Sequence, residues 1–347
     1  MATLAASRLH PALDRVLRLA AELGAIEGVE ESLGRILRGL AASPTGDAGI
    51  AAWSGSALGR IGFPVEIAFV VGDIGDTGDP SLRYTAEVAG PEVPRRDRLD
   101  AALALAGELA GPSAVRLGPE LERLLRAVQA EGTLKYGAWL AGRHRTGGTA
   151  AYKLYAEVPP ENCRLADGWE GRQVGAPPVL PHRQVQLSMV GHQAGRTELY
   201  YSSVGLKPGE VATAMSRIGM EARAPEVLAL LQEAYGRTLR LELPCQDFGW
   251  SYAFSGSGEA EAFTIYTFAN SLLGGDGRIR AAILRLAAAH GWELPLYEAM
   301  SRPLAERRGA LTHHGMFGIV VPRKGPLALS FGLVPPTCEP NFKAVPA

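Results

Sequence analysis

The chain has 347 residues, which is enough for two or three average domains or for a single large barrel. Lys and Arg total 35 against 36 Asp and Glu, a net charge of −1, and no long run of one sign resembles a nucleic-acid-binding surface. The three cysteines, Cys163, Cys245 and Cys338, lie far apart and in no metal-ligand spacing, which argues against a disulfide framework and a zinc site. A reducing, cytoplasmic environment fits this pattern best.

The start of the chain resembles an amphipathic helix more than a signal peptide, because charged residues such as Arg8, Asp14 and Arg18 interrupt its apolar positions. No stretch approaches the ~20 apolar residues of a membrane-spanning helix. We therefore expect neither a membrane nor a nucleic acid among the partners.

The expected elements alternate between helix pairs and strand pairs. In chain order they are helices at 9–24 and 29–41, strands at 64–71 and 82–89, helices at 97–111 and 117–131, strands at 135–143 and 150–158, strands at 184–191 and 196–203, helices at 208–219 and 224–236, strands at 247–255 and 261–269, helices at 276–290 and 294–306, and strands at 315–321 and 326–333. A helix pair is missing in the Pro/Gly-rich stretch 159–183. This repeat of five hairpins predicts one domain over residues 1–334, followed by a Pro-rich tail at 335–347.

Each strand alternates an apolar with a polar face. The apolar sets, which should pack against the helices, are Val65/Ile67/Phe69, Tyr84/Ala86/Val88, Tyr152/Leu154/Ala156, Val185/Leu187/Met189 and Phe263/Ile265. The opposite faces carry charges and tyrosines. An open sheet would leave these in solvent, whereas ten strands closed into a barrel would enclose them in a lumen wide enough for a ligand. We favour the α+β class and a closed ten-stranded antiparallel β-barrel surrounded by helices.

Three cations lie on the expected lumen face of successive hairpins: Arg83, Lys153 and Arg196. Buried cations are costly unless an anion neutralises them, and a diphosphate would do so through bidentate guanidinium contacts and the lysine charge. The alternative is an internal salt-bridge lattice with the inward glutamates Glu66, Glu87, Glu157 and Glu198. The pattern leaves both interpretations open.

Tyrosines follow two of these cations on the same face, at Tyr155 and Tyr200, and Tyr266 can join them from the fourth hairpin. Their hydroxyl groups can donate hydrogen bonds to an anion, and their ring faces can stabilise a carbocation.

Five short motifs occur in the order of the hairpins and with matching parity. They are Pro64-Val65-Glu66, Leu82-Arg83-Tyr84, Lys153-Leu154-Tyr155, Arg196-Thr197-Glu198-Leu199-Tyr200 and Thr264-Ile265-Tyr266. With the repeat of strand and helix pairs, which covers nearly the whole chain, this order resembles the aromatic prenyltransferases of the ABBA fold, and especially their dimethylallyltryptophan-synthase-like branch.

The resemblance implies electrophilic transfer of a prenyl group from an allylic diphosphate, such as dimethylallyl or geranyl diphosphate, to an aromatic small molecule or peptide. It implies that Glu66 is catalytic and accepts a hydrogen bond from the N–H of an indole-like acceptor; a phenolic acceptor is the other candidate. By the same resemblance, diphosphate binds Arg83, Lys153 and Arg196, and the allylic cation is shielded by Tyr155, Tyr200 and Tyr266. No Asp-Asp-x-x-Asp motif is present, so we expect no cofactor and no magnesium requirement.

Two positions are assigned to the acceptor pocket, Trp139 and Ser330. Trp139 is either a stacking wall for the acceptor ring or an ordinary core tryptophan. Ser330 belongs to a last strand whose lumen positions are small, where the resemblance implies a shielding tyrosine. Such positions either leave room for a longer prenyl chain or a bulkier acceptor, or mark a site that has lost catalysis.

Further positions set limits on the interpretation. Glu198 stands where the family pattern has a second cation, so it either weakens diphosphate binding or pairs with a neighbour such as Arg196. No inward lysine precedes Lys153 to serve as the base. The adjacent His313 and His314 point to opposite faces of a strand, so no metal site is expected. The alternative function is a non-catalytic barrel that binds an amphipathic small molecule.

Overall fold

Ten antiparallel strands close into one barrel in the part of the chain that the structure, a computed structural model, describes: residues 11–22, 28–41, 55–72, 81–111, 115–145, 150–175 and 180–336. The order around the barrel is β1-β10-β9-β8-β7-β6-β5-β4-β3-β2. The strands are β1 Val65–Val71, β2 Ser81–Glu87, β3 Ala138–Arg145, β4 Ala151–Glu157, β5 Val185–Gln193, β6 Arg196–Ser203, β7 Gly249–Ser255, β8 Ala260–Phe268, β9 His314–Pro322 and β10 Ala328–Leu333. The predicted closed barrel is confirmed.

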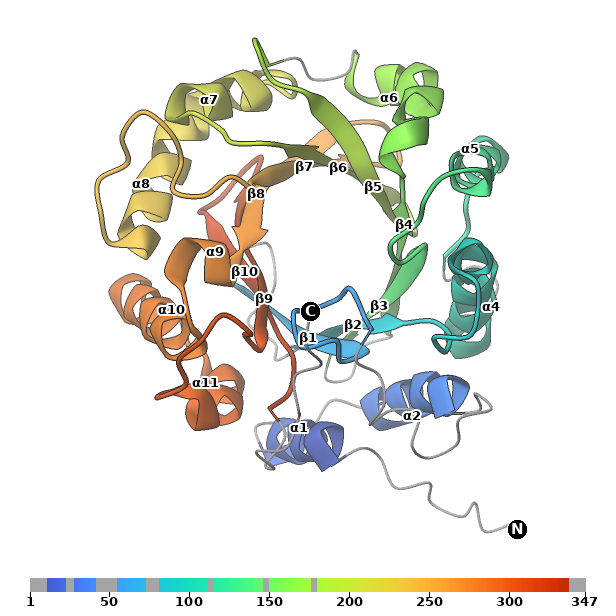
Figure 1. Cartoon of the computed structure of the whole chain (residues 1–347), viewed down its shortest axis with the longest axis horizontal. Helices are drawn as coiled ribbons and strands as arrows, with labels where there is room; N and C mark the ends of the chain where they lie inside the picture. The colour runs from blue at the N-terminus through green and yellow to red at the C-terminus, as the bar shows by residue number, and fades with distance from the viewer. Residues whose placement is uncertain are drawn as a thin grey trace.

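Helices surround the barrel on its outside (Figure 1). The α-helices are α1 Pro11–Glu22, α2 Val29–Ala41, α4 Arg98–Ala110, α5 Pro119–Ala130, α6 Asp167–Val174, α7 Pro208–Ser216, α8 Ala224–Tyr235, α9 Ala269–Leu273, α10 Asp276–His290 and α11 Pro295–Ser301. Short 3-10 helices are η1 Arg95–Asp97, η2 Pro160–Ala166, η3 Glu221–Arg223 and η4 Arg302–Leu304. In the described residues, no helix is both long enough and apolar enough to cross a membrane.

The elements follow the predicted order, with two differences. The stretch 159–183, for which no helices were expected, contains η2 and α6. These two short helices occupy the position at which the predicted helix pair was absent. The one-turn helix α9 directly follows β8 and was not predicted. All but the first two residues of the predicted tail at 335–347 lie outside the described residues.

The apolar strand faces pack outward against the helices, as predicted. Val65 and Ile67 of β1 are fully buried. Outward tyrosines also reach the helices: the Tyr201 hydroxyl donates to Glu170 of α6 at 2.8 Å, and the Tyr252 hydroxyl donates to a backbone carbonyl of α7 at 2.8 Å. The wall of the barrel is therefore fixed from outside by packing and by directed hydrogen bonds.

Met189 is an exception to the predicted faces. A bulge between Leu187 and Met189 shifts the register of β5, so that Met189 lies opposite Tyr200 of β6 and Glu157 of β4. Directly opposed residues of antiparallel strands share a face, and a bulge adds one residue to the count. Met189 therefore faces the lumen, and the prediction that it packs outward with Leu187 is wrong.

The two ends of the barrel differ. At one end, which we call the hairpin end, the first strand of each of the five hairpins finishes and the second begins. The connections that carry most of the helices lie at the other, which we call the helix end. On the lumen face, Arg83 and Lys153 lie toward the hairpin end of β2 and β4, whereas Glu87 and Glu157 end these strands at the helix end.

Candidate active site

One row of lumen residues crosses the first four strands. Glu66 of β1 lies opposite Thr85 of β2, Thr85 opposite Ala141 of β3, and Ala141 opposite Lys153 of β4. Because opposed residues share a face, the predicted catalytic carboxyl and the predicted diphosphate-binding lysine lie on the same wall of the lumen.

Lys153 binds a carboxylate of the chain itself. Its ammonium forms an ion pair with Glu198 of β6 and donates to the Tyr200 hydroxyl at 2.9 Å. Tyr200 donates in turn to the same Glu198 oxygen at 2.8 Å, and Ser251 donates to the other oxygen at 3.3 Å. The internal salt bridge that the sequence left as an alternative is thus present at Lys153.

The two groups stabilise each other's charge. Burial alone would raise the pKa of Glu198, but the charges of Lys153 and Arg196 lower it to about 2. Burial alone would lower the pKa of Lys153, but the Glu198 carboxylate raises it above its usual value. Lys153 and Glu198 are therefore both charged at neutral pH.

The three predicted cation-shielding tyrosines form a row beside this pair. The rings of Tyr155 and Tyr200 have centroids 5.9 Å apart, as do those of Tyr200 and Tyr266. The Lys153 ammonium lies 4.7 Å from the centroid of the Tyr155 ring. The Tyr266 hydroxyl donates to the backbone carbonyl of Tyr201 at 3.0 Å, which fixes its ring. The sequence placed these aromatic faces together correctly.

The other two predicted diphosphate-binding cations, Arg83 and Arg196, lie in different surroundings. Arg83 lies opposite Arg143 of β3 on the lumen face, which places two guanidinium groups on adjacent strands. The sequence analysis did not include Arg143 in the anion site. Arg196 forms an ion pair with Glu261 at 3.3 Å, and its side chain is 35% exposed, so it lies at the rim.

Glu66 is a buried carboxyl, with only 8% of the residue exposed. Its Oε2 atom has no hydrogen-bond partner among the described residues. Burial raises the pKa of Glu66 to about 8. Glu66 is therefore a buried carboxyl with one oxygen unpartnered in the described part of the chain, and burial favours its neutral form at neutral pH.

Small residues surround the Glu66 carboxyl. A Cβ atom on Gly315 or Gly332 would overlap the Glu66 oxygens, so the carboxyl occupies the space that a side chain at either position would need. Ser330 of the last strand lies opposite Val70 and Gly318 on the same wall. Gly332 leaves room for the Glu66 carboxyl, which gives a physical reason for a small residue in the strand where the resemblance implies a tyrosine.

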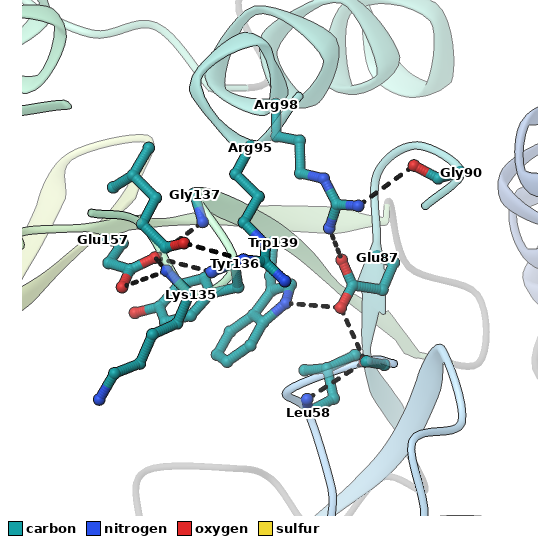
Figure 2. A network of polar contacts seen from close by, with 12 residues as sticks. Leu58, Glu87, Gly90, Arg95, Arg98, Lys135, Tyr136, Gly137, Trp139 and Glu157 are labelled. Atoms are coloured by element: carbon teal, nitrogen blue, oxygen red, sulfur yellow. Dashed lines mark hydrogen bonds and ion pairs between the residues drawn. The ribbon is translucent and has the colours of Figure 1, made fainter. Parts of the chain in front are cut away.

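Trp139 lies in the lumen wall opposite Glu87 on one side and Tyr155 on the other. Its indole N–H donates to Glu87 at 3.2 Å, and its ring stacks on Tyr136 with centroids 3.7 Å apart (Figure 2). Trp139 is half-buried, so it is not an ordinary core tryptophan. The sequence analysis did not single out Tyr136: it lay within the predicted strand 135–143, whereas β3 begins at Ala138 and Tyr136 lies in the connection before it.

Among the described residues, no group of three or more His, Cys, Asp or Glu is arranged to hold a metal ion. His313 and His314 instead belong to a buried network: the backbone N–H of each donates to Asp276, and the His314 ring is hydrogen-bonded to the same carboxylate at 2.7 Å. These contacts give both histidines a structural explanation.

A closed barrel of repeated strand and helix pairs, with a polar lumen lined by tyrosines, is the ABBA fold of the aromatic prenyltransferases. The 6-dimethylallyltryptophan synthase from Micromonospora olivasterospora, in complex with DMASPP and Trp, is 18% identical with a TM-score of 0.71, over 94% of this chain and 98% of that chain. The 5-dimethylallyltryptophan synthase from Streptomyces coelicolor is 18% identical with a TM-score of 0.69, over 93% and 96%.

The prenyltransferase PriB is 17% identical with a TM-score of 0.72, over 93% of this chain and 94% of that chain. No protein-family model matches the sequence, and no curated protein matches it. At these identities the likeness establishes the fold.

Proposed function

We propose that the chain is an aromatic prenyltransferase. The observation that carries the proposal is a single lumen in which the buried Glu66 carboxyl shares a row with Lys153 and faces a row of tyrosine rings. These are the groups that an allylic alkylation needs: cations for the leaving group, aromatic faces for the carbocation and an acceptor for the ring N–H.

In the proposed reaction the C–O bond of the allylic diphosphate breaks, and the diphosphate leaves with the electron pair. Arg83, Lys153 and Arg196 bind the departing anion, while Tyr155, Tyr200 and Tyr266 shield the cation. A carbon of the aromatic ring attacks the cation to form the new C–C bond. Glu66 orients this ring by accepting a hydrogen bond from the N–H of the ring. The ring then loses its proton to a base and regains aromaticity.

Solved structures of the same fold support this donor and acceptor. One was obtained with DMASPP and Trp, and PriB was obtained with L-tryptophan and dimethylallyl thiolodiphosphate. We propose dimethylallyl diphosphate as the first donor to test, with geranyl diphosphate as the longer alternative, and a tryptophan-like acceptor ahead of phenols and aromatic peptides. We also propose that magnesium is not required.

The test is incubation of the full chain with dimethylallyl or geranyl diphosphate and a panel of L-tryptophan, indole, phenols and aromatic peptides, each with and without EDTA. A prenylated product identified by mass spectrometry is expected in both conditions. The complete absence of product and of diphosphate binding would overturn the enzyme proposal, and activity lost only in EDTA would overturn the metal independence.

A second candidate is a non-catalytic barrel that binds an amphipathic small molecule. The observation that favours it is the ion pair between Lys153 and Glu198, which already gives the lysine an anionic partner. This candidate predicts saturable binding of prenyl alcohols or indoles, measured by calorimetry, with no pyrophosphate binding and no turnover.

A further inference from the structure

Two aromatic side chains lie at the helix end of the lumen and are stacked on each other. The Tyr136 and Trp139 rings are 3.7 Å apart between centroids and inclined by only 12°. Both residues are half-buried. Parallel aromatic rings at this separation are stacked face to face, and we call this stacked pair the aromatic plate.

Glu87 fixes the Trp139 half of the plate. One Glu87 oxygen accepts the indole N–H at 3.2 Å and the Ser56 hydroxyl at 2.7 Å, and the other pairs with Arg98 at 2.5 Å. The residue is only 1% exposed, so its carboxylate depends on these partners. Because the indole has one N–H donor, this hydrogen bond also sets the rotation of its ring.

Glu157 fixes the Tyr136 half. Its carboxylate accepts the backbone N–H groups of Lys135 at 2.9 Å, Tyr136 at 2.8 Å and Gly137 at 2.8 Å. Three successive N–H groups converge on one buried carboxylate, so the backbone that carries Tyr136 is ordered. Figure 2 shows the plate residues between Glu87 and Glu157.

The plate belongs to the part of the lumen wall formed by β2, β3 and β4. Tyr266 stands on β8, which is five strands away from β3 in the ten-stranded order and therefore on the opposite wall. Burial raises the pKa of Tyr136 well above its usual value, and the Glu157 carboxylate adds to this effect. Trp139 is also opposite Tyr155. The plate thus continues the row of tyrosine rings toward the helix end.

Glu66 belongs to the neighbouring row of lumen residues, on the hairpin-end side of Trp139. It shares a row with Ala141, and Trp139 is two residues before Ala141 on the same face. With a strand spacing of ~4.8 Å and a rise of ~3.3 Å per residue, the Cα atoms of Glu66 and Trp139 are separated by about 12 Å. Both side chains project from the same wall into the lumen, so the Glu66 carboxyl and the Trp139 ring belong to neighbouring parts of one surface.

We propose that Tyr136 and Trp139 form the platform on which the ring of the aromatic acceptor stacks, and that Glu87 and Glu157 are positioning residues for this platform. The inference rests on the proposed prenyl transfer and adds a specificity determinant to it. By fixing the plane of the acceptor ring, the platform selects which ring carbon meets the allylic cation, and so the regiochemistry of the product.

The direct test uses Trp139→Leu and Tyr136→Leu with L-tryptophan and dimethylallyl diphosphate. The KM for L-tryptophan should rise about tenfold, because a stacked aromatic pair is lost, while the KM for the donor changes less than about twofold. The ratio of product regioisomers, resolved by chromatography and NMR, should shift. Trp139→Phe should restore most of the affinity because it keeps a ring in the stack. Tyr152→Phe, on the outer face of β4, is the matched control.

The positioning role is tested with Glu87→Gln, which keeps the side-chain volume. It should shift the regioisomer ratio and raise the KM for L-tryptophan with little change in the donor KM. A merely structural role would reduce turnover with both substrates alike and leave the ratio unchanged. If Trp139→Leu does not fold, Tyr136→Leu carries the test, since it lies outside the strands.

Folded variants that keep the wild-type acceptor KM and regioisomer ratio would overturn the platform. A different result distinguishes failure of the proposed function: a wild-type chain that forms no product and shows no binding of indole or L-tryptophan by calorimetry overturns both proposals together.

Discussion

Lys153 on β4 is paired with the carboxylate of Glu198 on β6, and both belong to the lumen. The side chains are 18% and 10% exposed, so water screens the pair little. The cation assigned to the diphosphate therefore already has an anionic partner, and a donor molecule must compete with Glu198 or displace it. Because the family pattern has a cation at this position, Glu198 both removes a positive charge and adds a negative one.

Replacing Glu198 by Gln should strengthen the binding of inorganic pyrophosphate about tenfold or more. The substitution removes a competing charge-assisted contact worth ~1.5–3 kcal/mol while keeping the side-chain volume. Titration calorimetry at a fixed ionic strength measures the change. Glu261→Gln, at the exposed pair with Arg196, is the control and should have a small effect. Unchanged or weaker binding in Glu198→Gln would show that Lys153 does not contact the anion.

Lys153→Ala should unfold more easily than the wild type, as well as losing turnover. It leaves the Glu198 carboxylate buried without its ion-pair partner, which costs about 3 kcal/mol. The low pKa of Glu198 means that the pair stabilises the fold above its ordinary value of 4.5, and that this contribution is lost as the pH falls toward 2. Urea unfolding at pH 7 measures the loss.

The double variant Lys153→Ala/Glu198→Gln is the control for that experiment. It removes both charges, so it should recover most of the stability while turnover stays low. A single Lys153→Ala variant as stable as the wild type would contradict the description of Lys153 and Glu198 as a tightly coupled pair.

Glu66 should make the stability of the fold decrease as the pH rises. Its folded-state pKa of about 8 lies above the ordinary 4.5, so the folded protein favours the neutral form and loses stability between pH 4.5 and 8. Glu66→Gln removes that loss. At pH 8–9 the variant should therefore gain stability relative to the wild type, by about 5 kcal/mol at most, and it should gain nothing near pH 4. Denaturant unfolding at both values provides the comparison.

The same titration should appear in the activity. If the Glu66 carboxylate supports the positive charge that develops on the acceptor nitrogen, kcat/KM for L-tryptophan should rise with pH toward 8 and then level. Glu66→Gln should remove this rise. A wild-type profile that is flat between pH 6 and 9 would contradict this role.

The alternation of polar and apolar residues was enough to predict the barrel, because each strand buries one face against helices. Neighbouring residues such as Glu66 and Ile67 therefore show which strand face points into the lumen and which packs against the helices. The same rule fails at Met189, since a bulge changes the parity of β5 and has no signature in residue type. Likewise, the prolines and glycines in 159–183 concealed η2 and α6, where tertiary packing outweighs propensity.

For the candidate site, the sequence predicted which strand face each residue lies on, but not which residues contact one another. The lumen positions of Lys153, Arg196 and Glu198 follow from parity, but their partners depend on how neighbouring strands align across the barrel. The sequence suggested Arg196 as a partner for Glu198, whereas the contact is with Lys153. Tyr136 was missed because its order comes from Glu157, a residue distant in sequence.

Gly332→Ala should displace the Glu66 carboxyl and lower acceptor use. The added methyl group would overlap the Glu66 oxygens, so the strand or the carboxyl must move, at a cost of about 1–3 kcal/mol. The KM for L-tryptophan should rise while the donor KM remains close to that of the wild type. Gly107→Ala, on α4 with no atom near the new methyl group, is the control and should not destabilise the protein.

A second substitution decides whether the damage acts through Glu66. Glu66→Asp shortens the side chain by one methylene, so the combination with Gly332→Ala should relieve the overlap and be more stable than the sum of the two single effects. The free energies of unfolding of the four proteins give this coupling directly. Strict additivity would mean that Gly332 is required by the backbone of β10 alone, and that the small residues of the last strand are unrelated to the position of Glu66.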